Sequence, residues 1–424
     1  MRLFGSLSLW RLARGMLGAS GELPEASTHE ARRREAASSV RRSRAASARG
    51  ETHQRSNSAN GLGVQLRIVH NIILRWTVCL PAAAAIGWLG GCRRSIETQP
   101  RPVLTSDWLG ELPTAMRAEH VPHVAVAVVR ADGTIVDTVL SSGAQAATSD
   151  DVFEAASLTK PVFAALVMGL VRDGVIRLDA PLSTYPGWPR MSDPRADAIT
   201  AAMVLSHSSG LGNDNADSTK RLAFDPGHGW HYSGAGYRYL QQVIEHITRQ
   251  SLDELLRTRI FAPLGMERTT VVDADRPGFP WFVGHDRAGR PMPPDRFIRP
   301  SASTSLRTTA RDYARFLRAV MDGGRDGSPL RRADVAAMLD PRVSVDSLLG
   351  IRWGLGWALA GPVLFHWGSN PGFKSFVFAD RSRHLGLVML TDGDNGLELA
   401  PRLVRAATGH DYAFLRFYLL HPTD

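Results

Sequence analysis

Ser157 and Lys160 are separated by two residues, in a stretch that begins at Phe153 and reads Phe-Glu-Ala-Ala-Ser-Leu-Thr-Lys. A serine hydroxyl is a poor nucleophile near neutral pH and needs a neighbouring base to accept its proton. If a helix begins near Ser157, Lys160 lies one turn further along on the same face, where its amine can reach the hydroxyl. The spacing therefore predicts a serine nucleophile with a lysine beside it. A solvated helix surface is the alternative, because serine and lysine are common residues.

The residues after Lys160 predict the helix that this arrangement needs. Apolar side chains recur there at helical spacing, at Val162, Leu166, Val167, Leu170 and Val171. An ammonium held in an apolar wall loses hydration and releases its proton more easily. The chain has 50 lysines and arginines together but only three lysines. Since arginine cannot be deprotonated, the use of lysine at this position indicates that the residue acts as a base.

A second stretch, from Phe224 onwards, places Tyr232 just before another expected helix. A Pro-Gly turn and three further glycines hold the backbone of this stretch close to a cleft. A phenolate at Tyr232, favoured by the Lys160 ammonium, would be a base for Ser157 and then an acid for the leaving group. A tyrosine in a surface loop is the alternative.

A third stretch follows an expected strand and contains His366, Trp367, Gly368 and Ser369. A glycine in a strand often marks close approach of the backbone to a ligand. Backbone N–H groups here can point at a developing oxyanion, with the N–H of Ser157 as the second donor. A plain hairpin is the alternative, given the Asn-Pro-Gly turn that follows.

Taken together and in this order, the three stretches resemble the serine hydrolase family of class C β-lactamases, low-molecular-weight penicillin-binding proteins and related esterases. The resemblance covers residues 105–410. It implies that Ser157 is the nucleophile, that Lys160 and Tyr232 are its base system, and that 366–369 is the substrate-binding strand. The N–H groups of Ser157 and Ser369 would form the oxyanion hole. It implies no cofactor and no metal.

Two departures from the family pattern bear on the substrate. The β-lactamases have Tyr-x-Asn where this chain has Tyr232-Ser-Gly234, so the amide that contacts a β-lactam side chain is missing. They have Lys-Thr-Gly where this chain has His366, Trp367 and Gly368. His366 can donate a hydrogen bond or, when protonated, supply charge. Trp367 adds an aromatic surface or fills core on the other face of the strand.

We therefore expect an esterase or a peptidase/amidase acting on a substrate with an apolar acyl group, with at most weak β-lactamase activity. A class C-type β-lactamase or a D-alanyl-D-alanine carboxypeptidase is an alternative within the same fold. An acyltransferase, which would pass the acyl group to a nucleophile other than water, is another. A catalytically silent, membrane-tethered binding or sensor module is the alternative of a different class, kept open by Gly234.

Three further observations argue against other kinds of catalytic or metal site. His207 is interpreted as a structural loop histidine, because Lys160 and Tyr232 already supply a base system. No Gly-x-Ser-x-Gly motif occurs, which argues against an α/β-hydrolase. The polar run that begins at Asn213 lacks the glycine and the glutamate of a calcium loop, which favours a polar loop.

The order of apolar patterns predicts the fold class. Residues 121–140 predict a β-hairpin around an Asp-Gly turn, and further strands are expected between residues 354 and 391. Between them, residues 175–345 have a mainly helical pattern, and a last helix is expected near 397–407. An antiparallel sheet built from both chain ends and flanked by helices, with a helical insertion, is an α+β fold.

The positive charge of the chain is confined to its N-terminal part. The formal net charge is +9, and residues 1–100 contain 15 arginines and six glutamates. The remaining 35 basic and 35 acidic residues cancel, so residues 101–424 offer no net field for nucleic acid. Residues 1–63 have too little apolar surface to fold. We interpret them as disordered and as an extension upstream of a true start near Leu62 or Val64. A basic tail and a transit peptide are the alternatives.

Residues 64–92 have the layout of an export signal. Arg67 and Arg75 precede an apolar run, from Trp76 to Trp88, which is followed by Leu-Gly-Gly and Cys92. This ending resembles the lipobox of bacterial lipoproteins, in which the cysteine carries a lipid. The expectation is a periplasmic or cell-envelope lipoprotein, with residues 93–104 as a tether before a hydrolase domain at 105–424. A single membrane-spanning anchor is the alternative, although the run is shorter than the roughly 20 residues that a span needs.

Overall fold

The computed structural model describes residues 106–143, 146–188, 190–213, 221–273, 282–293 and 297–421. The chain divides into two compact units, 1–92 and 93–424, and all described residues belong to the second. The predictions for residues 1–63, 64–92 and 93–104, including lipidation of Cys92, lie outside the described residues. Among the described residues, no helix combines the length and the apolar composition that crossing a membrane requires.

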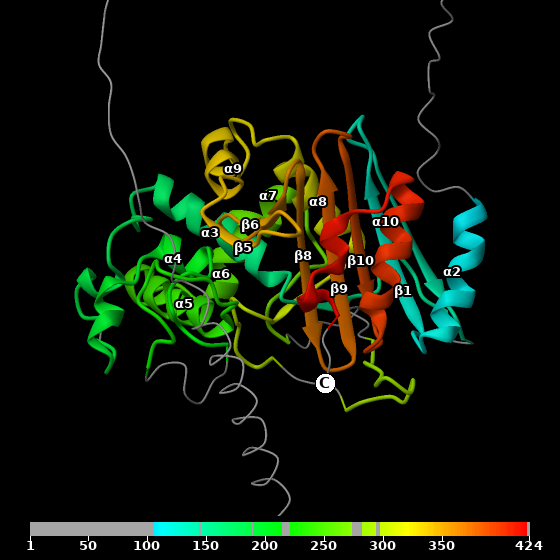
Figure 1. The fold of residues 1–424 in the computed structure, drawn as a ribbon, viewed down its shortest axis with the longest axis horizontal. Coiled ribbons are helices and arrows are strands. Elements are labelled where there is room, and N and C mark those ends of the chain that lie inside the picture. Colours follow the sequence, from blue (N-terminus) through cyan, green and yellow to red (C-terminus); the bar gives the residue numbers. More distant parts are fainter. Residues whose placement is uncertain are drawn as a thin grey trace, which may run out of the picture. The chain divides into compact units, whose positions relative to one another are not determined.

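Eight strands form one antiparallel sheet in the order β2-β1-β10-β9-β8-β7-β6-β5 (Figure 1). These strands are β1 (His123–Val129), β2 (Ile135–Ser141), β5 (Val343–Asp346), β6 (Ile351–Trp353), β7 (Ala358–Ala360), β8 (Val363–Asn370), β9 (Phe373–Asp380) and β10 (Leu385–Thr391). The expected hairpin is β1 and β2, and β1 pairs with β10 from the other end of the chain. The α+β class, with a sheet built from both chain ends, is confirmed.

The sheet is buried on both faces because its strands are apolar at nearly every position. In β1, all seven residues are buried. Val124, Val126 and Val128 face one core, and the residues between them face the other, as the period of two in a strand requires. Helices α2 (Ser106–Ala118) and α10 (Ala400–Thr408) cover the first face, whereas α3 (Thr159–Arg172) and α8 (Ala310–Met321) belong to the core on the second.

The expected helical segment, residues 175–345, follows α3 and contains α8. Its other helices are α4 (Ala201–Leu205), α5 (Gly234–Thr248), α6 (Leu252–Leu256), α7 (Ala262–Leu264) and α9 (Arg332–Met338), with a π-helical turn at Arg257–Phe261 and 3₁₀ turns at Leu182–Thr184 and Pro194–Ala198. Further 3₁₀ turns near the C-terminus are Gly396–Leu399, Ala413–Arg416 and Tyr418–Leu420. Helices α4, α5 and α6 gather to one side of the large sheet, and α2 and α10 lie towards its other side (Figure 1).

Two local features differ from the sequence-based expectations. The strand expected from Gly354 onwards begins only at Ala358, as β7, and residues 354–357 form the turn between β6 and β7. Gly354 approaches another backbone too closely for a side chain, since a Cβ there would lie 2.2 Å from the Met338 carbonyl oxygen. The second feature is a small separate sheet, not anticipated, in which β3 (Phe153–Ala156) pairs with β4 (Leu306–Thr308). This small sheet leads directly into Ser157.

Candidate active site

Ser157 lies in the tight connection between β3 and α3. The residue before it, Ala156, has a left-handed backbone (φ +48°), which turns the chain sharply out of the strand. The Thr159 hydroxyl donates to the Ala156 carbonyl oxygen at 2.6 Å and accepts the Leu306 N–H at 3.0 Å, so the connection is tied to β4. Ser157 itself is 9% exposed. The chain thus holds the hydroxyl at the rim of the core.

Lys160 reaches Ser157 as its spacing predicts. Its Nζ lies 2.9 Å from Ser157 Oγ, and it donates to the Ser303 carbonyl oxygen at 2.9 Å. The side chain is 1% exposed, and no carboxylate among the described residues pairs with it. Burial lowers the pKa of Lys160 well below its ordinary value, with the charge of Arg238 as a second cause. The amine is therefore disposed to be neutral, with a lone pair available to the Ser157 hydroxyl.

Tyr232 completes the group from the loop before α5. Its ring centroid is 4.8 Å from Lys160 Nζ, and its Oη is buried and has no hydrogen-bond partner among the residues that the structure describes. Burial raises the pKa of Tyr232, and the nearby Ser157 hydroxyl works against that rise. The pKa directions of Tyr232 and Lys160 contradict the phenolate and ammonium expected from the sequence. They favour a neutral phenol beside a neutral amine.

His207 is a buried neighbour of Tyr232 whose position the sequence did not reveal. It is fully buried, and its ring centroid lies 4.4 Å from that of Tyr232. Its Nδ1 accepts the Ser233 N–H at 3.0 Å, so Nε2 carries the proton of the neutral ring. That Nε2 has no partner within the described chain. The backbone at His207 is left-handed (φ +58°). No local sequence signal relates this residue to Tyr232, because their contact depends on two separate loops.

Strand β8 brings the predicted third stretch to the same place. Gly368 packs directly against the connection that carries Ser157, since a Cβ there would lie 2.4 Å from the Ala155 carbonyl oxygen. The Ser375 hydroxyl donates to that same oxygen at 2.7 Å. Trp367 is buried and stacks on Tyr232 with ring centroids 5.4 Å apart, so it both fills core and supports the tyrosine. The side chain of Ser369 is exposed.

His366 has a different character from the one expected. It is fully buried, and its Nδ1 donates to the Trp367 carbonyl oxygen at 2.8 Å. Burial lowers the pKa of His366 to about 3, with the charge of Lys160 as a second cause. The ring is therefore neutral, and its Nε2, which has no partner among the described residues, is an acceptor. His366 does donate a hydrogen bond, as expected, but to a backbone carbonyl oxygen, and its lowered pKa contradicts the expectation that a protonated ring supplies charge to the site.

Gly234, at the missing amide position, adjoins two polar side chains from elsewhere. Its N–H donates to Asn213 Oδ1 at 2.9 Å. A Cβ at this position would lie 3.1 Å from Asn213 Oδ1 and 3.2 Å from Arg238 Nη1. The space beside the glycine is thus occupied by an amide and a guanidinium that come from other positions of the chain.

A buried ionic cluster that sequence reasoning missed joins β3 to β8. Glu154 lies three residues before Ser157 and accepts from Arg307 Nη2 at 2.8 Å and from Asn370 Nδ2 at 2.8 Å. Arg307 also pairs with Asp273 at 2.7 Å. Because Asn370 follows Gly368 by two residues on β8, the cluster connects β8 to β3, the strand that leads into Ser157. Its members are distant in sequence and form no motif.

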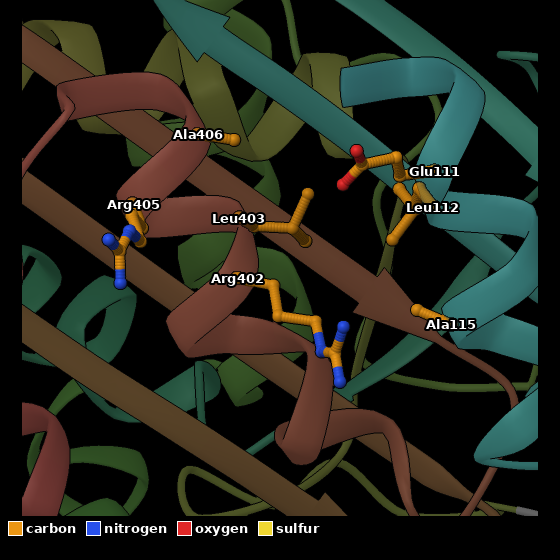
Figure 2. Close-up of a pocket in the computed structure, with 7 residues that line it drawn as sticks. All are labelled: Glu111, Leu112, Ala115, Arg402, Leu403, Arg405 and Ala406. Carbon is orange, nitrogen blue, oxygen red and sulfur yellow. The ribbon is translucent and has the colours of Figure 1, made fainter. Parts of the chain in front are cut away.

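A separate pocket of about 340 Å³ lies between α2 and α10, and Figure 2 shows the side chains around it. It is lined by Glu111, Leu112, Ala115, Arg402, Leu403, Arg405 and Ala406. None of the residues around Ser157 contributes to it. Within the described part of the chain, no group of His, Cys, Asp and Glu is arranged to hold a metal ion.

Comparison with known proteins agrees with this geometry. The β-lactamase family model matches residues 111–409. Penicillin-binding protein 4 of Amycolatopsis lactamdurans is 32% identical over 293 residues, or 61% of this chain and 75% of that protein. Esterase EstB of Burkholderia gladioli is 29% identical over 309 residues, or 57% of this chain and 78% of that protein.

The fold has solved counterparts. The D-alanine carboxypeptidase AmpC from Burkholderia cenocepacia superimposes with a TM-score of 0.61 at 21% sequence identity, covering 71% of this chain and 97% of that one. At this identity the likeness concerns the fold alone. The family match, by contrast, spans well over half of the sequence and includes every residue around Ser157. This chain belongs to the β-lactamase family of serine hydrolases.

Proposed function

We propose that this protein is a hydrolase that forms an acyl-enzyme on Ser157, acting as an esterase or a peptidase/amidase. The observation that carries the proposal is the 2.9 Å separation between Lys160 Nζ and Ser157 Oγ in a buried site. A neutral amine has two N–H groups and one lone pair. One N–H serves the Ser303 carbonyl oxygen, which leaves the lone pair for the Ser157 proton. Such a pair needs no third residue to activate the serine.

In the proposed reaction, Lys160 accepts the Ser157 proton as Oγ bonds to the acyl carbon of the substrate. The oxyanion that forms accepts hydrogen bonds from the backbone N–H groups of Ser157 and Ser369. In support, the Ser157 N–H has no acceptor within the described chain. Tyr232 remains a phenol and protonates the leaving group, then regains a proton from the Lys160 ammonium. Water cleaves the acyl-enzyme by the reverse sequence of proton transfers.

The departures from the β-lactamase pattern support an esterase or amidase over an efficient β-lactamase. His366, which is fully buried and whose pKa is lowered to about 3, is neutral and offers no positive charge to a carboxylate on that side. The esterase among the relatives makes ester hydrolysis a reasonable activity to test first. The penicillin-binding protein among them makes penicillin the necessary second substrate.

The test uses the chain with a short-chain p-nitrophenyl ester and, separately, with a fluorescent penicillin. Ser157→Ala should abolish turnover of the ester, while Ser344→Ala, at an exposed position of β5, should keep it. Product analysis with added alcohols distinguishes hydrolysis from acyl transfer. Fast turnover of penicillin would identify a β-lactamase instead. No acylation by either compound in folded protein would favour a binding module.

We also propose that Cys92 carries a lipid and that the protein is an exported, membrane-anchored lipoprotein. The proposal is supported by the charged and apolar residues that precede Leu-Gly-Gly-Cys92. Mass spectrometry of the native protein should find a diacylglycerol-modified cysteine as its first residue. Peptides from residues 1–63 in a digest of the native protein would contradict the expected start near Leu62.

A further inference from the structure

Arg238 is a cation next to the catalytic group that the proposed reaction does not use. It lies in the first turns of α5 and is half-buried. Its Nη1 donates to the Ser303 hydroxyl at 3.1 Å, and the carbonyl oxygen of the same serine accepts from Lys160 Nζ at 2.9 Å. One serine therefore separates the guanidinium from the amine that contacts Ser157.

The charge of Arg238 has no counter-ion in the described part of the chain. Its hydrogen bond is to a neutral hydroxyl, and burial lowers the pKa of Arg238. Arg307, for comparison, is buried between Glu154 at 2.8 Å and Asp273 at 2.7 Å. Partial burial of a cation is costly unless an anion accompanies it. An anionic ligand would supply that partner.

The glycine at position 234 makes the room for this guanidinium. A Cβ at Gly234 would lie 3.2 Å from Arg238 Nη1 and 3.1 Å from Asn213 Oδ1, tighter than ordinary contacts of 3.4 Å or more. Asn213 uses its Oδ1 to accept the Gly234 N–H, so its amide nitrogen remains as a donor. The absence of a side chain thus brings two groups of hydrogen-bond donors to one place beside the site.

The opposite wall of the site does not compete for an anion. His366 is neutral, and its Nε2, which has no partner among the described residues, is a buried acceptor. A buried, neutral imidazole supplies no positive charge, so His366 does not provide anion recognition on this wall. The positive charge available for a substrate lies on the α5 side.

We propose that Arg238, together with Asn213, forms an anion-binding subsite, and that the preferred substrates carry a carboxylate near the bond that is cleaved. This inference rests on the proposed function and narrows its substrate class. A guanidinium binds a carboxylate through charge-assisted, often bidentate, hydrogen bonds. Hydrogen bonds to charged groups contribute enough to change kcat/KM on the order of 10- to 100-fold.

The test compares matched esters that differ only in charge. Mono-p-nitrophenyl adipate and its methyl ester place the charge on the acyl side. Butyrate esters of 4-hydroxybenzoate and of methyl 4-hydroxybenzoate place it on the leaving-group side. In at least one pair the anionic ester should have the higher kcat/KM. Arg238→Gln should reduce that preference roughly 10-fold or more, and Arg238→Lys should restore part of it.

Arg257→Gln is the matched control, because it removes the same charge at an exposed position of the helical segment. Gly234→Ala should act in the same direction as Arg238→Gln but more weakly, since its methyl group would lie 3.2 Å from Arg238 Nη1 and would push the guanidinium aside by only a few tenths of an ångström. If Arg238→Gln slows the charged and neutral esters equally, Arg238 only holds Ser303 in place, and the proposal is wrong. A wild-type enzyme that prefers the neutral ester in both pairs would also overturn it.

A binding measurement separates this inference from the proposed function. In Ser157→Ala, calorimetric titration should show tighter binding of an anionic ester than of its neutral partner, and adding Arg238→Gln should remove the difference. If wild-type protein turns over no ester, the proposed hydrolase activity fails, while the titration still decides the subsite. Equal binding of charged and neutral esters would refute the subsite even in an active enzyme.

Discussion

Replacing Gly368 with alanine would drive a methyl group into the backbone that carries Ser157. The new Cβ would lie 2.3 Å from Ser375 Oγ, 2.4 Å from the Ala155 carbonyl oxygen and 3.0 Å from the Ala156 Cβ. A serine hydroxyl can rotate away, but the Ala155 carbonyl belongs to β3 and cannot. Widening a 2.4 Å approach to an ordinary contact of 3.4 Å requires a shift of about 1 Å.

That shift moves Ser157, the proposed nucleophile, relative to the proposed oxyanion donors, because Ala155 lies two residues before Ser157 and Gly368 lies one residue before Ser369. A displacement of about 1 Å in a catalytic arrangement can cost roughly 10²-fold in rate. Overpacking of this kind destabilises a fold by about 1–3 kcal/mol. Gly368→Ala should therefore lower kcat/KM for a p-nitrophenyl ester roughly 100-fold, and chemical unfolding should show a loss of about 1–3 kcal/mol.

Gly143→Ala is the matched control, since a Cβ there meets nothing within 4 Å and the backbone is not left-handed. Its activity and stability should match those of the wild-type protein. A Gly368→Ala enzyme with wild-type kcat/KM would show that the close approach of β8 to β3 does not position the site. A loss of stability with no loss of activity would refute it as well.

Three further predictions concern the charges of the site. Lys160→Arg should reduce kcat roughly 10²- to 10⁴-fold, because arginine keeps its proton. In the wild type, kcat/KM should rise with pH as Lys160 loses its proton, and the midpoint of that rise should lie well below pH 10.5. A pH profile that is flat below 10.5 would contradict a titrating Lys160. His366 has a pKa of about 3 in the folded state against an ordinary 6.5, so the unfolded chain binds its proton first as pH falls below 6.5. Between pH 6.5 and 5, the protonation of this histidine in the unfolded chain should lower the free energy of unfolding by up to about 2 kcal/mol. Urea unfolding should show a smaller drop over this pH range in His366→Asn than in the wild type. Equal drops in the two proteins would contradict the lowered pKa of His366. Glu154→Gln removes one buried charge while Arg307 retains Asp273, so unfolding should become easier by about 1–3 kcal/mol; unchanged stability would mean that the cluster does not hold the site.

The parts of the fold that the sequence predicts are those encoded by local spacing. Ser157 and Lys160 are one helical turn apart, so their contact follows once α3 forms. The alternation in β1 likewise places Val124, Val126 and Val128 on one face of a sheet. Such patterns need only neighbouring residues to be interpreted correctly.

The features that the sequence did not predict depend on pairing between strands far apart in the chain or on burial in the folded protein. Strand β3 is four residues long and pairs with β4, about 150 positions later, so no local pattern marks it. The protonation of Tyr232 and His366 follows from desolvation in the assembled core, which a sequence does not display. The approach of Arg238 to Gly234 is visible only when the packing of α5 against Ser303 is known.

The central claim is that Ser157 becomes acylated with Lys160 as its base. The most direct measurement is rapid quenching of the enzyme during turnover of a p-nitrophenyl ester, followed by intact-protein mass spectrometry and peptide mapping. One added acyl group, located on Ser157, is expected in the wild-type enzyme; it should be absent from Ser157→Ala and strongly reduced in Lys160→Arg. An acyl group on another residue, or full ester turnover by Ser157→Ala, would contradict it.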